Sequence, residues 1–591
     1  MTEEIRHRGP DDAGFELRPG LGFGHRRLAV IDTELSKQPM SSSDGRHLLT
    51  YNGEIYNYAE LRCELEADGE AFVTHGDTEV LLRLLMKHGI AGLERVNGQF
   101  AFAYFDEGED ALWLARDRVG IRPLFHARGN GFLAFASEIK ALAPAMNSGF
   151  QLEEASLEHY LAHRFVPPPN TLYKGVRALM PGTAIRIQRD GSIVETSYWS
   201  FPRMPVDDDR EAGDSVERVR ELLEDSVELR LRADVPVGVM LSGGLDSTLL
   251  AAMVKRARGG GEVLTYTAGF ENDEHSELPH ARFASQAIGL DHHEVTVSAE
   301  DFGDLWQKLT WHRDAPISQA SDVAIFQLSG LAREKVKVLL SGEGADELFA
   351  GYPKHGVDGY LRIFDVLPAK LRSSVFRRLE RALPKRLSRL RILVRALASR
   401  SSAERVSSWF GSFTWYERAA LHAELGKVLG EELWQSATGD HLSRLLYVDC
   451  QGWLSANLLE RGDRMLLGNS VEGRVPFLDH RLVELAMTLP ANVRKPGKSI
   501  VRELAADLVP REILERRKWG FKVPLETWFR GKLREFSHDL LLSRDSFVRE
   551  FCNREPIEAM LETHDKGRRN ESLRIWTLLA LEIWHRNTLA V

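Results

Sequence analysis

Cysteine is scarce in this sequence: its 591 residues contain three, Cys63, Cys450 and Cys552. They lie far apart and fit no CxxC, zinc-ribbon or disulfide spacing, which excludes a disulfide-stapled secreted domain and a cysteine-based zinc site. We therefore expect structural thiols in a protein of the reducing cytoplasm.

A long apolar run and a surplus of positive charge are also missing. No segment approaches the roughly 20 apolar residues of a membrane helix, and the first residues, MTEEIRHRGPDD, are charged where a secretory signal is apolar. The formal net charge of -9 gives no general attraction for nucleic acid or anionic membranes. We expect small-molecule substrates as partners, with no nucleic acid and no membrane span.

The sequence does contain enough apolar material for several domains. Hydrophobic residues make up 43% of it and charged residues 28%, as in ordinary globular proteins. Its length exceeds the roughly 100 to 200 residues of one domain. Because two prolines and a cluster of charges follow Trp199, we predict a first domain at 1–200, a linker at 201–214 and a second domain at 215–591.

The two predicted domains differ in pattern. Between residues 22 and 187, short apolar runs broken by Gly, Asn and Asp indicate strands, while 58–67 and 77–88 have helical periodicity. In the second domain, apolar runs at 235–241, 263–270 and 336–340 alternate with helical stretches, which favours a parallel sheet covered on both faces. Beyond Tyr352 the pattern is mostly helical.

A basic stretch at 370–400 interleaves arginine and lysine with Leu, Val and Ile. This pattern has two interpretations: a surface that meets a membrane or an anionic partner, and an amphipathic helical pair with a solvated basic face. We favour the helical pair. The basic residues include Lys370, Arg372, Arg377, Arg378, Arg381, Lys385, Arg386, Arg389, Arg391 and Arg395.

Residues 242–247 read SGGLDS, directly after an apolar run and before a helical segment. Two adjacent glycines let backbone N–H groups close on an anion, and the following helix adds the positive end of its dipole. We therefore predict a pyrophosphate-binding loop. Asp246 would be repelled by phosphate unless a cation lay between them, which implies Mg²⁺. Because no GxxxxGK[ST] motif occurs here, cleavage between the α and β phosphates of ATP is favoured over kinase-like transfer.

A second apolar run ends in SGEGADELFAGY at 341–352. In an open parallel sheet, ligands bind beyond the carboxyl ends of the strands, so both motifs should face one crevice. We predict that Asp346 shares Mg²⁺ with Asp246 and that Glu343 acts on a proton of an attacking amine. The predicted ATP- and pyrophosphate-binding residues are Leu241, Ser242, Gly243, Gly244, Asp246, Ser247, Ser341 and Gly342.

These motifs resemble those of the glutamine-dependent asparagine synthetase family, together with DRMLLGNSVEGRVPFLDHRLVE at 463–484 and GKSIVRE at 497–503. The amino-terminal half is similar to the glutaminase domain of that family. The segments that carry this similarity are HRGPDD at 7–12, HRRLAVID at 25–32, NGEIYN at 52–57, GDTEV at 76–80 and ARDRVGIRPLF at 115–125. The resemblance covers essentially the whole chain in the family's order.

The resemblance implies an Ntn-hydrolase-like glutaminase domain, an αββα sandwich that is incomplete here. A parallel-sheet ATP-pyrophosphatase domain of the PP-loop type, with a helical carboxyl-terminal part, follows it. The implied reaction is ATP-dependent amidation of aspartate to asparagine through an acyl-adenylate, with glutamine or ammonia as nitrogen donor and release of AMP and pyrophosphate. Lys498 matches the family's pyrophosphate-stabilising lysine, and ion pairs of Arg464, Glu472 and Arg474 are expected to shape the cleft. The family also implies a possible homodimer.

The family's glutaminase uses an amino-terminal cysteine as nucleophile, and this sequence has none. HRGPDD begins at residue 7 instead of a few dozen residues later, and Cys63 lies in a predicted helix. We expect either that the chain begins inside a longer gene product or that free ammonia is the donor, and we favour the first. The residues that match the family's glutamine-binding positions are Arg27, Asn52, Gly53, Glu54 and Asp77, with Asn52 and Gly53 as an oxyanion hole.

Two other functions stay open. A related amidotransferase would use the same phosphate chemistry on another carboxylate, such as a uronic acid of a surface polysaccharide or an intermediate of a secondary metabolite. The acceptor pocket, expected from 314–322 and the segment near Glu472, would decide between them. A non-catalytic scaffold is the alternative of another class, but it would not need acids such as Asp246 and Asp346 beside a phosphate loop.

Overall fold

The computed structural model describes residues 1–129, 131–146, 149–203, 212–271, 276–383, 387–422, 429–490, 492–516 and 523–589. Most of the predicted linker at 201–214 lies outside these ranges, as do Lys385 and Arg386 of the basic stretch. Within the described residues, no helix is long and apolar enough to cross a membrane.

The amino-terminal part consists of antiparallel sheets with helices against one face. A six-stranded sheet has the order β11-β10-β6-β5-β4-β3, a three-stranded sheet has the order β8-β7-β9, and β1 pairs with β2. The elements are β1 Asp12–Arg18, β2 Leu21–Arg27, β3 Met40–Ser41, β4 His47–Ile55, α1 Tyr58–Ala67, α2 Asp77–His88, β5 Gly98–Asp106, β6 Ala111–Arg116, β7 Phe125–Gly129, β8 Phe132–Ala136, α3 Ala155–His163, β9 Val176–Ala178, β10 Thr183–Gln188 and β11 Ile193–Ser197.

Strand β5, with the sequence GQFAFAYFD, shows why this sheet is covered on both sides. Its alternate residues point to opposite faces. Phe100, Phe102 and Tyr104 pack with residues of α1 and α2, whereas Ala101 and Ala103 pack with residues of β2 and the three-stranded sheet. The large side chains therefore fill the helix layer and the small ones admit the second sheet. Helices α1 and α2 confirm the predictions at 58–67 and 77–88.

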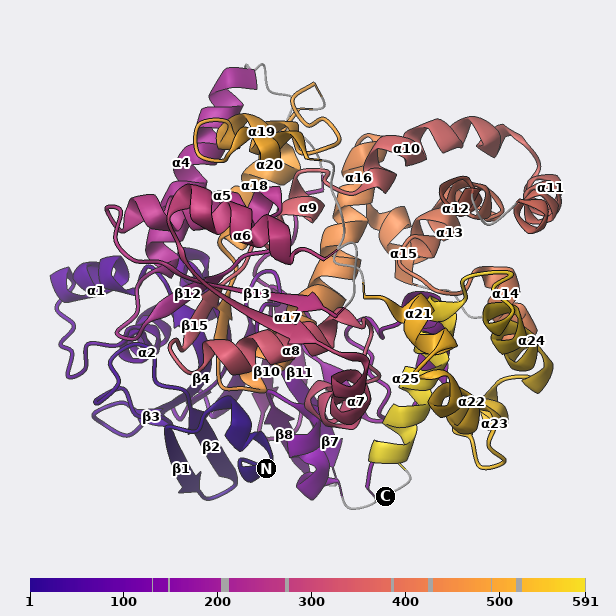
Figure 1. The fold of residues 1–591 in the computed structure, drawn as a ribbon. Coiled ribbons are helices and arrows are strands. Elements are labelled where there is room, and N and C mark those ends of the chain that lie inside the picture. Colours follow the sequence, from indigo (N-terminus) through magenta and orange to yellow (C-terminus); the bar gives the residue numbers. More distant parts are fainter. Residues whose placement is uncertain are drawn as a thin grey trace.

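The second part is built on a parallel five-stranded sheet with the order β14-β13-β12-β15-β16. Helices α4 and α5 share a core with one face, and α7 and α8 share a core with the other (Figure 1). The elements are α4 Ala212–Arg230, β12 Val237–Met240, α5 Leu245–Ala257, β13 Leu264–Phe270, α6 Leu278–Ile288, β14 Asp291–Val297, α7 Ala299–Arg313, α8 Ser321–Ala332, β15 Val338–Leu340, α9 Ala345–Leu348 and β16 Glu472–Arg474. The predicted parallel, doubly covered sheet is confirmed.

The rest of the chain is helical, as its pattern predicts. A lobe of α10 to α13 with α15 projects from the body, α14 packs against α24, and α25 packs against α7 (Figure 1). The helices are α10 Pro353–Leu361, α11 Ala369–Ala382, α12 Ser388–Leu397, α13 Ser402–Ser408, α14 Trp415–Leu421, α15 Leu429–Ser436, α16 His441–Val448, α17 Leu459–Leu467, α18 His480–Thr488, α19 Ser499–Ala505, α20 Arg511–Glu515, α21 Leu525–Arg530, α22 Arg534–Leu542, α23 Phe547–Phe551, α24 Arg554–Asp565 and α25 Ser572–Thr588.

Buried ion pairs join the two parts. Arg122 pairs with Glu472 at 2.8 Å and with Asp463 at 2.9 Å, and Arg464 pairs with Glu138 at 3.0 Å. Breaking a buried pair by removing one partner leaves an uncompensated charge and typically costs about 3–5 kcal/mol. These pairs therefore fix the amino-terminal part against the synthetase sheet. The expectation that ion pairs of Arg464, Glu472 and Arg474 shape the nucleotide cleft is wrong. All three residues pair across this junction, and none of them lines the cleft.

Candidate active site

The SGGLDS loop lies between β12 and α5, as the sequence predicts. Gly243 has φ +66°, and a Cβ there would clash with the backbone at His280, so the loop requires glycine at this position. The hydroxyls of Ser242 and Ser247 lie 2.9 Å apart, and the backbone N–H of Ser242 donates to the Ser247 hydroxyl. The loop is thus closed by its own serines, and Gly244 is the N-cap of α5.

The SGEGADE segment follows β15, the strand directly beside β12. The two motifs touch: a Cβ on Gly342 would stand 3.1 Å from the Cβ of Asp246. Parallel neighbouring strands end at the same edge of a sheet, which brings both segments to one crevice as predicted.

Lys498 joins the two motifs. It lies just before α19, is 5% exposed, and its Nζ pairs with Asp246 and with Asp346, the latter at 2.6 Å. Burial lowers the pKa of Lys498, but the carboxylates of Asp246 and Asp346 outweigh burial and raise the pKa above its usual value. The lysine is therefore a fixed cation between two acids in the first turns of α5 and α9, the helices that follow two neighbouring strands.

Gly351 makes room for this arrangement. A Cβ at that position would overlap both the carboxylate of Asp346 and the side chain of Lys498. The glycine of FAGY is thus a steric requirement of the acid–lysine–acid cluster, and the motif alone did not indicate this role.

A cavity of about 580 Å³ opens at this edge of the sheet. Seven of the eight residues predicted to bind ATP and pyrophosphate line it, and Gly243 stands behind them in the loop. The lining also contains Asp346, Glu343 and Lys498. The sequence-predicted lining residues are Leu241, Ser242, Gly244, Asp246, Ser247, Ser341 and Gly342.

Glu343 has a partner that the sequence did not reveal. Its Oε1 accepts a hydrogen bond from Arg461 of α17 at 2.7 Å. Arg461 also donates to Gln319 at 3.1 Å, so it lies between the nucleotide side of the cavity and the 314–322 segment. Arg461 stands outside every motif, and only the packing of α17 against α8 brings it to the cavity.

The predicted acceptor segment 314–322 does reach the cavity through Gln319 and Ser321. Behind them, burial raises the pKa of Asp322 to about 6. Glu472, in contrast, does not line this cavity but borders the amino-terminal pocket. The prediction that the segment near Glu472 forms the acceptor pocket is therefore wrong for Glu472, because its carboxylate is held by Arg122 and Arg474.

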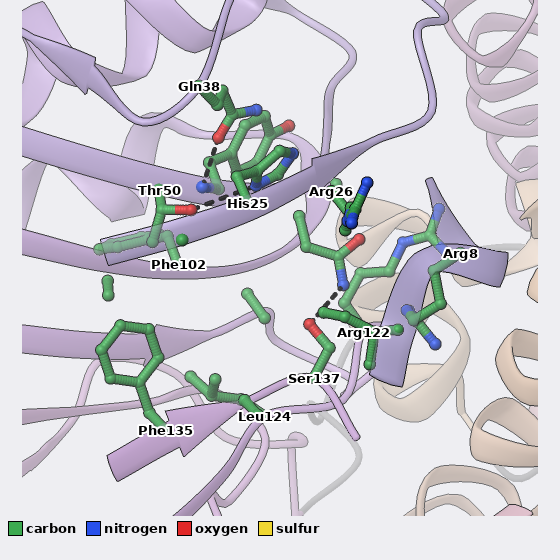
Figure 2. Close-up of a pocket in the computed structure, with 18 of the residues that line it drawn as sticks. Arg8, His25, Arg26, Gln38, Thr50, Phe102, Arg122, Leu124, Phe135 and Ser137 are labelled. Carbon is green, nitrogen blue, oxygen red and sulfur yellow. Dashed lines mark hydrogen bonds between the residues drawn. The ribbon is translucent and has the colours of Figure 1, made fainter. Parts of the chain in front are cut away.

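A second cavity, of about 360 Å³, lies in the amino-terminal part (Figure 2). His25 and Thr50 are hydrogen-bonded on one wall, and Ser137 lies opposite, near Arg122. The residues predicted to bind glutamine all line it: Arg27, Asn52, Gly53, Glu54 and Asp77. None of the three cysteines lines it; Cys63 is exposed on α1.

These residues are strongly engaged by the protein itself. Arg27 donates to the carbonyls of Ile31, Asp32 and Thr33 at 2.7 to 3.2 Å. Asp77 accepts from the Tyr51 hydroxyl at 2.8 Å and from the backbone of Ile55 at 2.9 Å.

Two carboxyls of the pocket have raised pKa values. Burial raises the pKa of Asp77 to about 6. Burial, with the charges of Asp77 and Glu472, raises the pKa of Glu54 well above its usual value. Glu54 Oε2 has no hydrogen-bond partner among the described residues, so it can form a hydrogen bond with a ligand in the pocket.

Comparison with known proteins agrees with this pair of sites. Residues 1–199 match the glutamine amidotransferase domain family, and residues 218–586 match the asparagine synthase family. The chain is 32% identical to asparagine synthetase [glutamine-hydrolyzing] 1 of Bacillus subtilis, over 99% of this chain and 92% of that protein. It is 36% identical to a putative asparagine synthetase [glutamine-hydrolyzing] of Mycobacterium bovis, over 98% and 92%.

A further relative has a different name. The chain is 27% identical to Amidase chry2 of Gibberella zeae, over 91% of this chain and 86% of that protein. Two matched domain families and relatives above 30% identity over nearly the full length lead to one conclusion. The chain belongs to the glutamine-hydrolysing asparagine synthetase family of carbon–nitrogen ligases.

Proposed function

We propose that this chain activates the side-chain carboxylate of aspartate with ATP and converts the resulting acyl-adenylate to asparagine. AMP and pyrophosphate are the other products. One observation carries the proposal: Asp246, Asp346 and Lys498 converge beside a glycine-rich loop at the ends of two neighbouring parallel strands. That arrangement matches the needs of pyrophosphate departure, in which negative charge develops on a leaving group and fixed cations and N–H groups stabilise it.

The loop residues take the triphosphate. The first turn of α5, which no side chain caps, offers backbone N–H groups to an anion, and Lys498 adds a positive charge beside it. In this proposal, phosphate oxygens exchange for one carboxylate partner of Lys498, and the lysine then neutralises the departing pyrophosphate.

Mg²⁺ fits the remaining donors. Mg²⁺ in nucleotide sites is held by one or two carboxylates together with substrate phosphates and water. Asp246 Oδ1 is buried and has no hydrogen-bond partner among the described residues, and Asp346 lies across the same lysine. Asp246 and Asp346 would hold the ion, which would neutralise phosphate charge.

Glu343 is placed to accept a proton. When ammonia attacks the acyl-adenylate, its nitrogen must lose a proton as the C–O bond to AMP breaks, and a positioned carboxylate serves as base. Arg461 holds Glu343 at 2.7 Å on the side of the cavity that Gln319 and Ser321 also line. The acceptor and the amine would meet there.

The amino-terminal pocket would bind the nitrogen donor glutamine through Arg27, Asn52, Gly53, Glu54 and Asp77. Cleavage of its amide also needs a nucleophile, and none of the cysteines lines the pocket. The described residues of this chain therefore support free ammonia as the nitrogen donor. We further propose domains at 1–200 and 215–591 joined at 201–214, a cytoplasmic location and a homodimer; the family matches at 1–199 and 218–586 support the division.

The test is to incubate the protein with ATP, aspartate and ammonium chloride and to measure asparagine and pyrophosphate. Asp246→Asn should lower both by about a thousand-fold, because it removes the carboxylate charge that holds the cation beside the leaving pyrophosphate. Asp190→Asn, in the exposed β10–β11 turn, is the matched control and should leave both unchanged. Turnover of the Asp246→Asn protein at the parent's rate would refute the proposed metal role. Pyrophosphate release that ignores aspartate would indicate another carboxylate as acceptor.

A further inference from the structure

Exposed apolar side chains gather in one short segment. Of the 21 large hydrophobic residues that are exposed in the described part of the chain, eleven lie between residues 360 and 392. Val366 is 88% exposed and Ile363 is 72% exposed. We call these eleven side chains the outer face: Tyr360, Ile363, Phe364, Val366, Leu367, Leu371, Val375, Leu379, Leu387, Leu390 and Ile392.

An ordinary surface helix turns its apolar stripe toward the core. Helix α11 buries Phe376 in the core of the lobe but exposes its other large apolar side chains. Leu371, Val375 and Leu379, spaced four residues apart, form one exposed stripe. The opposite stripe contains two ions, Arg372 and Glu380, which are buried.

Polar contacts hold this orientation. Arg372 donates to the carbonyls of Ser399 and Arg400 and pairs with Asp365 at 2.8 Å. Glu380 accepts from the hydroxyl of Tyr416 at 2.7 Å and pairs with Arg569. Because these bonds fix the rotation of α11, the leucines cannot turn inward without breaking them.

The exposed charges around the outer face are all of one sign. Between residues 360 and 400 the only acids are Asp365 and Glu380, and both are paired with arginines. Several arginines of the basic stretch also serve inside the fold: Arg395 pairs with Glu417, and Arg391 donates to a backbone carbonyl. Arg400 pairs with Glu404 at 3.2 Å. The other exposed basic side chains of this segment are Arg362, Lys370, Arg378 and Arg381.

The outer face has the right position for a contact with a large surface. Helices α11 and α12 form the tip of the lobe that projects from the body, away from the antiparallel sheets (Figure 1). Leu371 and Leu379 lie eight residues apart on α11, so the stripe is about 12 Å long on a helix of about 21 Å. A membrane or a partner could approach it without meeting the rest of the molecule.

We propose that the outer face binds the surface of an anionic phospholipid bilayer. Apolar side chains insert into the boundary between headgroups and acyl chains, while lysine and arginine contact anionic headgroups, and the two effects add. A second copy of this face is a poor occupant, because it would bring four positive charges against four. The net charge of the whole chain is -9. The exposed basic residues beside the outer face are therefore a local concentration of positive charge on an acidic protein.

This binding would place the synthetase cavity near the membrane. Tyr352, at the start of α10, lines the cavity, and the outer face begins eight residues later, at Tyr360. The proposal concerns where the protein acts and does not depend on which carboxylate it amidates.

The experiment is sedimentation of the full chain with vesicles of phosphatidylcholine alone and of phosphatidylcholine mixed with phosphatidylglycerol. We expect binding to the mixed vesicles only, weakening as salt is raised. The triple change Lys370→Gln, Arg378→Gln and Arg381→Gln should reduce the partition constant about a hundred-fold, since each basic residue contributes roughly five-fold. The triple change Leu371→Ser, Val375→Ser and Leu379→Ser should also reduce it at least ten-fold.

Matched controls come from other exposed residues. Leu17→Ser with Val73→Ser, and Arg511→Gln, remove exposed apolar and basic side chains elsewhere and should leave binding unchanged. ATP-dependent pyrophosphate release measured without vesicles verifies that each variant is folded. Equal binding to neutral vesicles, or no binding at all, would overturn the proposal. So would a dimer that the serine variant dissociates, which would make the outer face a subunit interface, or nucleic-acid binding that the glutamine variant removes.

Discussion

The synthetase cleft and the amino-terminal pocket both bring charged residues together from separate motifs, but they hold them differently. In the cleft, Lys498 is shared by Asp246 and Asp346 at the edge of a 580 Å³ cavity, so phosphate can replace a partner. In the pocket, Arg27 and Asp77 are bonded largely to backbone groups of their own domain. In the proposed function, charge in the cleft therefore serves the ligand first, whereas charge in the pocket also stabilises the fold.

The largest expected effect is that of Lys498→Ala on chemistry. Removing the cation should slow pyrophosphate release by about 100- to 1,000-fold, the usual cost of losing one group that stabilises developing charge. ATP affinity should change less than ten-fold, because loop N–H groups still bind the phosphates. Rapid-quench measurement of pyrophosphate and equilibrium binding of ATP separate the two quantities. Lys566→Ala, at an exposed lysine of the carboxyl-terminal helices, is the control. Equal losses in rate and affinity would show that the lysine binds ground state and transition state alike.

Arg27→Met tests the other half of the comparison. The variant leaves three backbone carbonyls without their donors and should lower the free energy of unfolding by about 3 kcal/mol. Ammonia-dependent asparagine formation should persist below the unfolding transition. Urea unfolding monitored by tryptophan fluorescence gives the stability, and Arg95→Met, at an exposed arginine, is the control. An unchanged unfolding midpoint would mean that these contacts do not stabilise the pocket.

The smallest effect concerns pH. Burial raises the pKa of Asp77 from its usual 3.8 to about 6. Between these values the folded protein binds a proton that the unfolded chain does not, so this carboxyl makes stability fall as pH rises through the window.

Asp77→Asn abolishes that proton uptake. The free energy of unfolding of the variant, compared with that of the parent, should therefore rise by about 1 kcal/mol as pH increases from 5 to 7. Unfolding curves of both proteins at the two pH values measure it, with the exposed Asp68→Asn as control. A stability difference that does not change with pH would contradict the raised pKa.

Much of the fold and of the cleft followed from local patterns. The glycines and strand-to-helix setting of SGGLDS, and its repetition in SGEGADE, place both loops at one sheet edge because parallel strands end together. Helical periodicity located α1 and α2 to the residue. The pairing of Arg461 with Glu343 was not predictable, because Arg461 belongs to no motif and reaches the cavity only through helix packing.

The errors had the same origin. Arg464 and Glu472 belong to the 463–484 segment, which was expected to border the cleft. Their partners Glu138 and Arg122 come from the amino-terminal half of the chain. For the basic stretch, the pattern predicted a helical pair with a solvated basic face. The helical pair is confirmed, but the prediction of the faces is wrong for α11, whose apolar stripe is exposed while Arg372 and Glu380 are buried. Tertiary bonds of Arg372 and Glu380 decided that the leucines point outward.

The sequence by itself determined the class of each domain, the two glycine-rich motifs and the family. Strand periodicity, glycine placement and motif spacing involve residues that are close together in the sequence, so they can be read without a structure. The tertiary structure alone decided which charges meet. Ion pairs depend on distances of a few ångströms between residues hundreds of positions apart, such as Asp246 with Lys498, and only the folded chain sets those distances.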